Sequence, residues 1–301
     1  MTTDNDKLRA LRREIDVIDD SIHDLIMERT KIVERVRTAK KNDKIKIRPA
    51  REAEILYRLM ARHQGAFPKR ELARIWRELI VATLRFEGPF SVAVAAPEDE
   101  PGFWDLARDQ YGSFTPMTRH VSTRGVVEAV QNGNVTVGIL PLPQPDDTEY
   151  WWRLLVSEAP DTPRIIARLP FISPGNGRGT DLEALAISSV GQEETGRDRS
   201  FLAVEAAEDI GFKVIESALS QAGFSTGFNQ VWHDLDRPAA WTYLVEVLGF
   251  LNSDGRPIVR FKEGLGQQAS RVIHLGGYGT PLGEGELTTS QDSVLEGERE
   301  S

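Results

Sequence analysis

Residues 8–36 read LRALRREIDVIDDSIHDLIMERTKIVERV, and this stretch decides the fold of the first part of the chain. Its large apolar residues recur at alternating intervals of three and four. They are Leu8, Leu11, Ile15, Ile18, Ile22, Leu25, Ile32 and Val36. This spacing is typical of one long helix that packs along a single apolar seam. The pattern therefore predicts a first helix that ends near Lys41.

Two more helices are expected after this one. Pro49 is well placed to open a second helix that runs to about His63, because proline is favoured in the first helical turn. A short loop with Gly65 and Pro68 then precedes a third helix. Its inward positions carry Leu72, Trp76, Leu79 and Thr83. The sequence thus predicts an all-α domain of three helices over residues 1–88.

Beyond this domain the pattern changes to strands alternating with helices. The apolar runs SVAVAAP and TVGILPLP, with helix-like stretches between them, predict an α/β unit over residues 89–190. Residues 196–282 follow the order strand-helix-strand-strand-helix-strand, which predicts an α+β ferredoxin-like domain. The glycine-rich residues 175–179 follow no convincing strand and open no helix, which favours a linker over a phosphate-binding loop. Residues 283–301 are acidic and poor in large apolar residues, so a disordered tail is expected there.

The composition narrows the classes of function. The 301 residues include no cysteine, which excludes disulfides and thiolate metal sites and suits a reducing cytoplasm. No apolar run approaches the roughly 20 residues that span a bilayer, so neither membrane insertion nor secretion is expected. The net charge of −9 combines a basic first domain with an acidic remainder. A basic domain often meets nucleic acid or a small anion, and without an RNA-binding motif the small anion is favoured.

Polar residues occupy positions where the first domain should bury apolar side chains. Arg29 interrupts the seam, and the same spacing continued past Val36 reaches Lys40. These two cations lie about 16 Å apart along the helix axis, so both can point into one cavity. Each could instead be a snorkelling side chain or pair with an acid. Inward positions on the second and third helices carry Arg51, Glu52, Thr83 and Glu87.

Each of these polar residues also has a purely structural explanation. Thr83 could satisfy its own backbone, and Glu52 could favour the N-terminus of its helix. Taken together, however, several cations, a threonine and two glutamates on inner faces of three helices indicate a hydrophilic, anionic occupant.

These residues, in this order, resemble the all-helical chorismate mutase domain. The likeness covers essentially all of residues 8–87. It is carried by LRALRREIDVID, MERTKIV, RTAK, RPAREAEIL and WRELIVATLRFEGPF. The resemblance implies an isomerase that converts chorismate to prephenate by a pericyclic rearrangement, in the shikimate pathway of aromatic amino acid biosynthesis. It implies no cofactor and no metal.

The resemblance gives catalytic roles to three residues. Arg29 would clamp a carboxylate of the substrate, and Lys40 would bind both a carboxylate and the ether oxygen. Glu87, when protonated, would donate a hydrogen bond to the ether oxygen. Some relatives have glutamine at the position of Glu87, and many have an acid where this chain has Arg48.

Four further residues would bind the substrate. Arg51 would hold a carboxylate, Glu52 would take the ring hydroxyl, and Thr83 would assist at a carboxylate. Arg12 matches the family's remaining carboxylate-binding arginine, yet it lies about 26 Å from Arg29 along the helix axis. If Arg12 serves this site, it must therefore come from a second chain, and the resemblance implies the family's intertwined homodimer with two composite sites.

The rest of the chain resembles a degenerate prephenate dehydratase followed by an ACT domain. LRFEGPFSVAVAAPE resembles the junction into the dehydratase, but PLPQP and LEAL replace its Glu-Asn-Ser cluster and its Thr-Arg-Phe triplet. GRDRSFLAVEA, WTYLVEVLGFL and HLGGYG resemble the ACT domain, an aromatic amino acid sensor. GFKV at residues 211–214 and QVWH at residues 230–233 replace its two phenylalanine-binding motifs. Two alternatives remain: an active bifunctional mutase/dehydratase, and a non-catalytic regulator that binds an aromatic amino acid.

Overall fold

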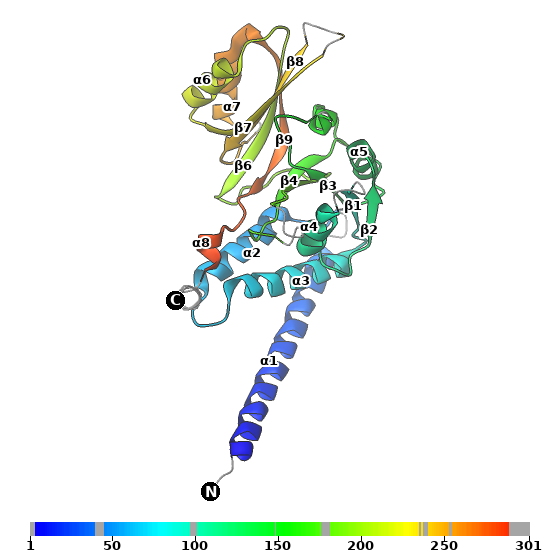
Figure 1. Ribbon diagram of the computed structural model, residues 1–301, viewed down its shortest axis with the longest axis vertical. Coiled ribbons are helices and arrows are strands. Elements are labelled where there is room, and N and C mark those ends of the chain that lie inside the picture. The colour runs from blue at the N-terminus through cyan, green and yellow to red at the C-terminus, as the bar shows by residue number, and fades with distance from the viewer. Residues whose placement is uncertain are drawn as a thin grey trace.

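The first domain contains the three expected helices (Figure 1). The computed structural model describes residues 4–39, 45–96, 101–147, 149–175, 181–234, 236, 240–252 and 255–288. The helices are α1 (Asp4–Ala39), α2 (Pro49–Arg62) and α3 (Lys69–Glu87). They begin and end within a few residues of the predicted positions. None of the described helices is long and apolar enough to cross a membrane.

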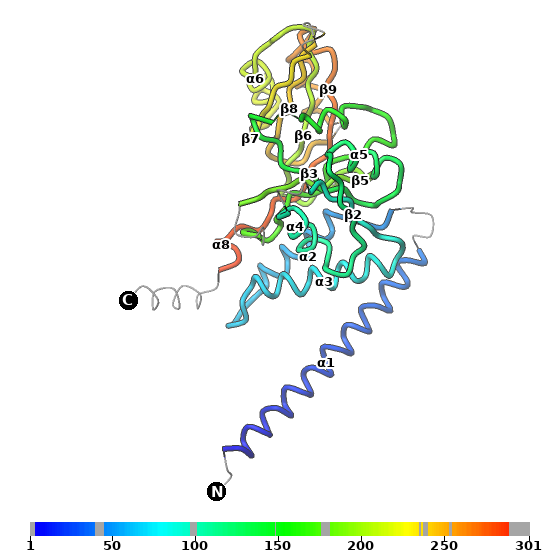
Figure 2. The backbone as a smooth tube through the Cα atoms, turned by 45° about the vertical axis from the view of Figure 1, so that its right-hand side comes forward, coloured from blue at the N-terminus to red at the C-terminus, as the bar shows by residue number. Residues whose placement is uncertain are grey.

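Helix α1 extends away from the rest of the molecule, and only its C-terminal part approaches α3 (Figures 1 and 2). Not one residue of α1 is buried. The large apolar residues of its seam are between 39% and 63% exposed. An apolar stripe of this length, interrupted at Arg29, is unusual on the surface of a protein and is typical of an interaction surface.

The strands of the described residues form one sheet of nine in the order β2-β1-β3-β5-β4-β9-β6-β8-β7. Its first half holds β1 (Val92–Ala95), α4 (Gly102–Tyr111), β2 (Met117–His120), α5 (Thr123–Gln131), β3 (Val137–Pro141), a 3-10 helix η1 (Trp151–Leu155), β4 (Arg164–Leu169) and β5 (Ala184–Ser188). Strand β1 lies parallel to both β2 and β3, as in the expected α/β unit. The sequence reading missed β2 and β4.

The second half has the expected strand-helix-strand-strand-helix-strand order. Its elements are β6 (Asp198–Ala206), α6 (Phe212–Ala222), β7 (Ser225–His233), β8 (Trp241–Leu248), α7 (Arg256–Leu265), the 3-10 helix η2 (Gly266–Gln268) and β9 (Ala269–Gly279). The four strands are antiparallel in the order β9-β6-β8-β7, which is ferredoxin-like topology.

The two halves join where β4 lies parallel to β9, at Ile165 and Gly276. Gly276 has a φ of +102°, and a Cβ there would lie 2.3 Å from the Ile165 carbonyl oxygen, so only glycine fits this joint. One apolar core continues across it, with Trp152 and Ile165 on one side and Phe201 and Leu244 on the other. The domain boundary expected near residue 190 therefore divides the chain without dividing the core.

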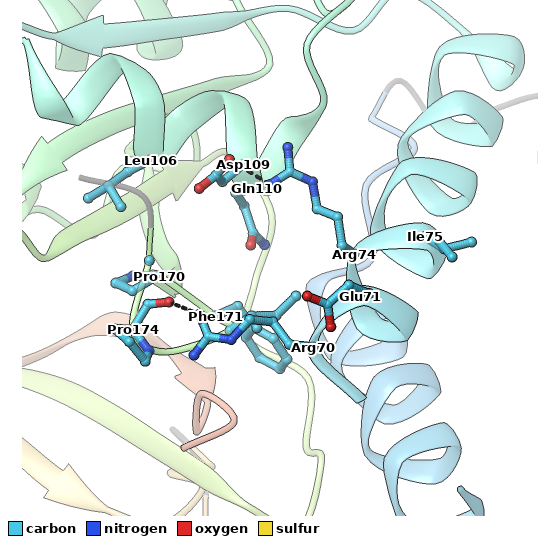
Figure 3. Close-up of a pocket in the computed structure, with 12 residues that line it drawn as sticks. Arg70, Glu71, Arg74, Ile75, Leu106, Asp109, Gln110, Pro170, Phe171 and Pro174 are labelled. Atoms are coloured by element: carbon cyan, nitrogen blue, oxygen red, sulfur yellow. Dashed lines mark hydrogen bonds and ion pairs between the residues drawn. The ribbon is translucent and has the colours of Figure 1, made fainter. Parts of the chain in front are cut away.

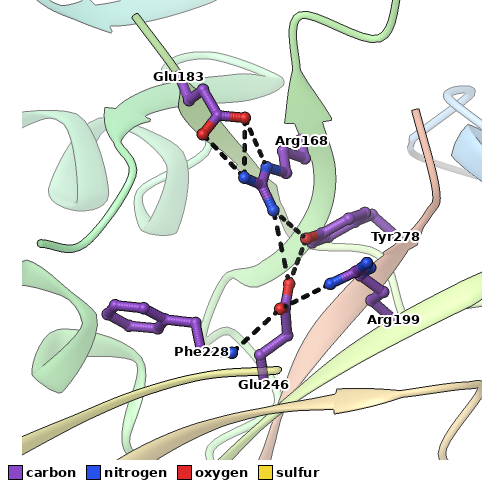
Figure 4. A network of polar contacts seen from close by, with 6 residues as sticks. All are labelled: Arg168, Glu183, Arg199, Phe228, Glu246 and Tyr278. Carbon is purple, nitrogen blue, oxygen red and sulfur yellow. Dashed lines mark hydrogen bonds and ion pairs between the residues drawn. The ribbon is translucent and has the colours of Figure 1, made fainter. Parts of the chain in front are cut away.

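A polar network also crosses the joint (Figure 4). Arg168 on β4 holds Glu183 through its Nη2 atom, which lies 2.8 Å from each carboxylate oxygen. Its Nη1 atom lies 3.8 Å from the buried Glu246 on β8. Glu246 also accepts hydrogen bonds from Arg199, at 3.0 Å, and from Tyr278. Because its carboxylate has several charged and polar partners, burial of this acid is compensated.

The start of the predicted disordered tail is ordered in the structure. Helix α8 (Glu284–Leu287) follows β9, and Leu287 is buried beside Leu56 of α2. Glu286 accepts two hydrogen bonds from Arg197, at 2.7 and 3.0 Å. The expectation of disorder is wrong for residues 283–288, because a single apolar side chain and a paired carboxylate fasten this segment. Residues 289–301, like residues 176–179 of the predicted linker, lie outside the described residues.

Candidate active site

Helices α1 and α3 bring Arg29 near Glu87. The Arg29 side chain is about half-buried; burial lowers the pKa of Arg29, and the negative charge of Glu87 acts in the opposite direction. A second contact joins the same two helices, since the guanidinium of Arg37 lies 5.7 Å from the centre of the Phe86 ring. Arg29 and Glu87, two residues of the predicted site, thus lie close enough for the charge of one to act on the other.

Thr83 lies one turn before Glu87 on α3 and is partly buried. Its hydroxyl oxygen is 3.1 Å from the Leu79 carbonyl oxygen and 2.7 Å from that of Ile80. A hydroxyl has one proton and two lone pairs, so this proton is used by the helix itself. Thr83 would have to give up that bond before it could donate to a substrate carboxylate.

One cation of the predicted site, Arg12, is not brought to this group within one chain. Arg12 is exposed on the same uninterrupted helix as Arg29. The straight helix keeps them about 26 Å apart, so they cannot bind one small molecule together. Lys40 lies outside the described residues.

The structure separates Arg51 and Glu52, which the sequence analysis placed on the same inner face. Arg51 is exposed, and its Nη1 atom lies 3.0 Å from the carboxylate of Glu54, one turn further along α2. Glu52 is buried, and it faces Arg77 of α3, with 2.9 Å between Oε2 and Nη1.

Glu52 therefore differs from its expected role as the ligand of the ring hydroxyl. The physical reason is its position on α2, where it borders the buried face formed by Ala53, Leu56 and Met60. That face packs against α3 and the loop after β4. Glu52 thus lies in the interface with the rest of the protein, where it forms an ion pair with Arg77.

The partner of Glu52 was missed in the sequence. Arg77 is 1% exposed, and its guanidinium lies 5.2 Å from the centre of the Phe171 ring. Burial lowers the pKa of Arg77 and raises that of Glu52, and each partner opposes the shift of the other. The signal was available: Arg77 continues the spacing of the buried α3 residues Ala73, Ile80, Val81 and Leu84. It is the same kind of signal that pointed to Arg29.

Comparison with known proteins defines the class of the helical domain. Residues 11–88 match the family described as Chorismate mutase type II. The chain thus carries a chorismate mutase type II domain over the three helices described above.

The chain also has relatives that extend beyond this domain. It is 39% identical over 144 residues to a bifunctional chorismate mutase/prephenate dehydratase of Stutzerimonas stutzeri, an alignment that covers 46% of this chain and 39% of the relative. It is 32% identical over 146 residues to the protein of the same description from Pseudomonas aeruginosa, covering 46% and 40%. Both alignments are longer than the helical domain, so they include part of the α/β unit. The chain spans about two fifths of the length of these relatives.

Among solved structures, the prephenate dehydratase of Arthrobacter aurescens in complex with L-Phe gives a TM-score of 0.49 at 10% identity. The match covers 70% of this chain and all of the other.

Proposed function

We propose that this protein is a chorismate mutase, an isomerase that converts chorismate to prephenate in the biosynthesis of phenylalanine and tyrosine. The observation that carries the proposal is the family match over residues 11–88, the region that contains the candidate site. The proximity of Arg29 and Glu87 supports it, because the two residues stem from different helices.

The active form would be a homodimer. The exposed apolar seam of α1 gives the physical reason, since a second copy of α1 could cover it. In such a dimer Arg12 of one chain would reach the site that contains Arg29 of the other. Each dimer would hold two composite sites.

The chemistry needs positioning and electrostatics. Chorismate is a dianion that rearranges within one molecule, so Arg29, Arg51 and the partner's Arg12 would clamp its carboxylates in the reactive shape, with help from Thr83. Lys40 and a protonated Glu87 would meet the negative charge that develops on the ether oxygen. One such donor is typically worth about a hundredfold or more in kcat. Glu52 has no part in this proposal, because its carboxylate is ion-paired with Arg77.

The later parts of the chain would regulate or stabilise. The α/β unit would be a dehydratase-like remnant without that activity, and the ferredoxin-like half an ACT-like domain. The altered second motif, at residues 230–233, is occupied within the chain: Trp152 donates to the Gln230 side chain at 2.6 Å, and Arg153 packs over the Trp232 ring. These contacts support a proposal in which the ACT-like domain either binds an aromatic amino acid in a changed site or binds no amino acid. The cysteine-free composition supports a cytoplasmic location.

The test is an assay of chorismate consumption by the full chain, with the product identified in the presence and absence of phenylalanine. Prephenate as the end product is the expected result. Phenylpyruvate would instead show a working bifunctional enzyme. No turnover together with saturable binding of phenylalanine would show a non-catalytic regulator and would overturn the proposal.

A further inference from the structure

A cavity of about 510 Å³ lies between α3 and α4, beside the segment that follows β4 (Figure 3). Arg70 and Arg74 face it from α3, Gln110 faces it from α4, and Phe171 forms part of its base. Thr83 and Glu87 lie further along α3, and neither lines this cavity. Its volume falls in the range of sites that hold small molecules.

The walls of the cavity are mostly apolar. The residues Leu106, Pro170, Phe171, Ile172 and Pro174 supply them. Arg70 fixes one wall, because its guanidinium donates to the carbonyl oxygens of Pro174, at 2.6 Å, and Ser173, at 3.2 Å. A space with such walls accepts an apolar body more readily than a cluster of water molecules.

The charged groups around the cavity balance one another. Arg74 lies 2.7 Å from Asp109 across it, and Arg70 stands beside Glu71 on α3 (Figure 3). The four side chains sum to zero formal charge. An occupant with a net charge would have to disturb this balance, so the cavity favours an uncharged molecule.

Gln110 is the group that points to a ligand. It is only 7% exposed, and Figure 3 shows its amide extending from α4 into the space above Phe171. Among the described residues its side chain has no hydrogen-bond partner, and its amide atoms are absent from the fully enclosed atoms that lack one, so the amide opens into the cavity. Buried polar groups are nearly always hydrogen-bonded, and an amide offers two donors and an acceptor. Gln110 also stands on the buried face of α4, among Leu106, Ala107 and Tyr111, where an apolar residue would stabilise the fold more.

A neighbouring cavity is small enough for one water molecule to satisfy its polar groups. Gln110 and Phe171 also border a smaller space of about 10 Å³, which Glu52 and Arg77 line as well. The Oε1 atom of Glu52 and the Nε atom of Arg77 have no hydrogen-bond partner among the described residues. This space is the size of a single water molecule, which could join both atoms. The larger cavity is about fifty times as big.

We propose that the cavity between α3 and α4 binds an uncharged small molecule with a ring-sized apolar body and one polar group that both donates and accepts, held by the Gln110 amide. The apolar body lies against Leu106 and Phe171, and the polar group pairs with Gln110. The site does not depend on the proposed mutase activity.

The experiment uses the full chain and three probes that share one benzene ring: benzamide, benzoate of the same size, and the smaller toluene. Binding is measured by saturation-transfer NMR and calorimetry. Benzamide should bind with a Kd of about 1 mM, as expected for so small a ligand, and more tightly than benzoate. Gln110→Leu should weaken benzamide at least about fivefold while toluene keeps its affinity. Gln221→Leu, at an exposed position on α6, is the matched control and should change neither.

A second readout separates a binding role from a packing role. The free Gln110→Leu protein should melt no lower than the wild type, because an unpaired buried amide is replaced by an apolar group. Glu71→Trp, at an exposed position beside the cavity, should weaken both benzamide and toluene even if the leucine variant folds poorly. The site would be overturned if the wild type did not bind benzamide, or if Gln110→Leu and Glu71→Trp both bound it as tightly as the wild type. Tighter binding of benzoate would overturn the uncharged class of ligand.

Discussion

Arg77 of α3 and Glu52 of α2 form a buried ion pair, with 2.9 Å between Nη1 and Oε2, at the interface between the helical domain and the rest of the protein. Each group loses its hydration there, and each keeps one atom without a hydrogen-bond partner within the described residues. Such a pair is costly to break from one side and adds little stability over an apolar pair.

Arg77→Met should lower the free energy of unfolding by about 3–5 kcal/mol, because it leaves the Glu52 carboxylate buried alone. The double variant Glu52→Leu with Arg77→Met should regain most of that loss. Urea denaturation of the two single variants and the double variant measures the coupling. Arg51→Met, which removes the exposed pair with Glu54, is the control and should cost about 1 kcal/mol at most. A double variant as unstable as Arg77→Met would refute this account of the pair.

His274 on β9 should make stability fall in acid. Burial, and secondarily the charge of Arg164, lower its pKa from 6.5 to about 4, so the folded protein keeps it neutral. The unfolded chain takes up a proton near pH 6.5 and the folded one only near pH 4, so stability present above pH 6.5 is lost between these values. The loss should approach about 3 kcal/mol.

His274→Gln should remove this part of the pH dependence, measured as urea midpoints at about pH 7 and about pH 4.5. His23→Gln, at an exposed position on α1, is the matched control and should behave as the wild type. If the slope of stability against pH is the same in His274→Gln and in the wild type, His274 is not the group responsible.

Much of the fold could be predicted because it rests on local patterns. The seam of α1 and Pro49 at the start of α2 gave three helices with nearly correct ends. Strand β2 escaped notice because its four residues, MTRH, lie at the edge of the sheet and are partly exposed, so they show no apolar pattern. The joint between Ile165 and Gly276 was also beyond reach, since it depends on the approach of two segments far apart in sequence.

The surroundings of the candidate site residues were harder to predict from the sequence than the helices. The cation Arg29 in an apolar seam led to the prediction of an anionic occupant, with an acidic partner as the alternative, and in the structure Glu87 lies near it. The same signal at Arg77 was overlooked, and its partner, Glu52, was assigned to the substrate instead. Periodicity alone could not decide which side of α2 Glu52 faces, because it stands at the border of the buried face.

The seam of α1 should be the dimer interface of the proposed enzyme. Ile18→Asp places a charge in the middle of the seam and should convert the dimer to monomers, with loss of mutase activity. The measurement is sedimentation velocity together with chorismate turnover. Val17→Asp is a closely matched control, since Val17 is also exposed but lies about 100° around the helix from Ile18. A dimer that survives Ile18→Asp, or that Val17→Asp disrupts equally, would show that the seam is not the interface.

The composite site gives the last prediction, which concerns Arg12 and Arg29. Each is exposed or half-buried on α1, so Arg12→Ala and Arg29→Ala should both fold, and each alone should lose at least about a hundredfold in turnover. In a dimer of the two variants, one site contains Arg29 from the first chain and Arg12 from the second and is intact, while the other site lacks both. After random exchange of equal amounts, about half of the dimers contain one chain of each variant. Each of these has one intact site of two, so the mixture should recover about one quarter of the wild-type activity. The measurement is turnover after unfolding and refolding the two variants together, with subunit exchange verified by mass-tagged chains. Mixtures of each variant with itself are the controls and should stay inactive. If exchange is complete and no activity returns, Arg12 and Arg29 do not serve one site across the dimer.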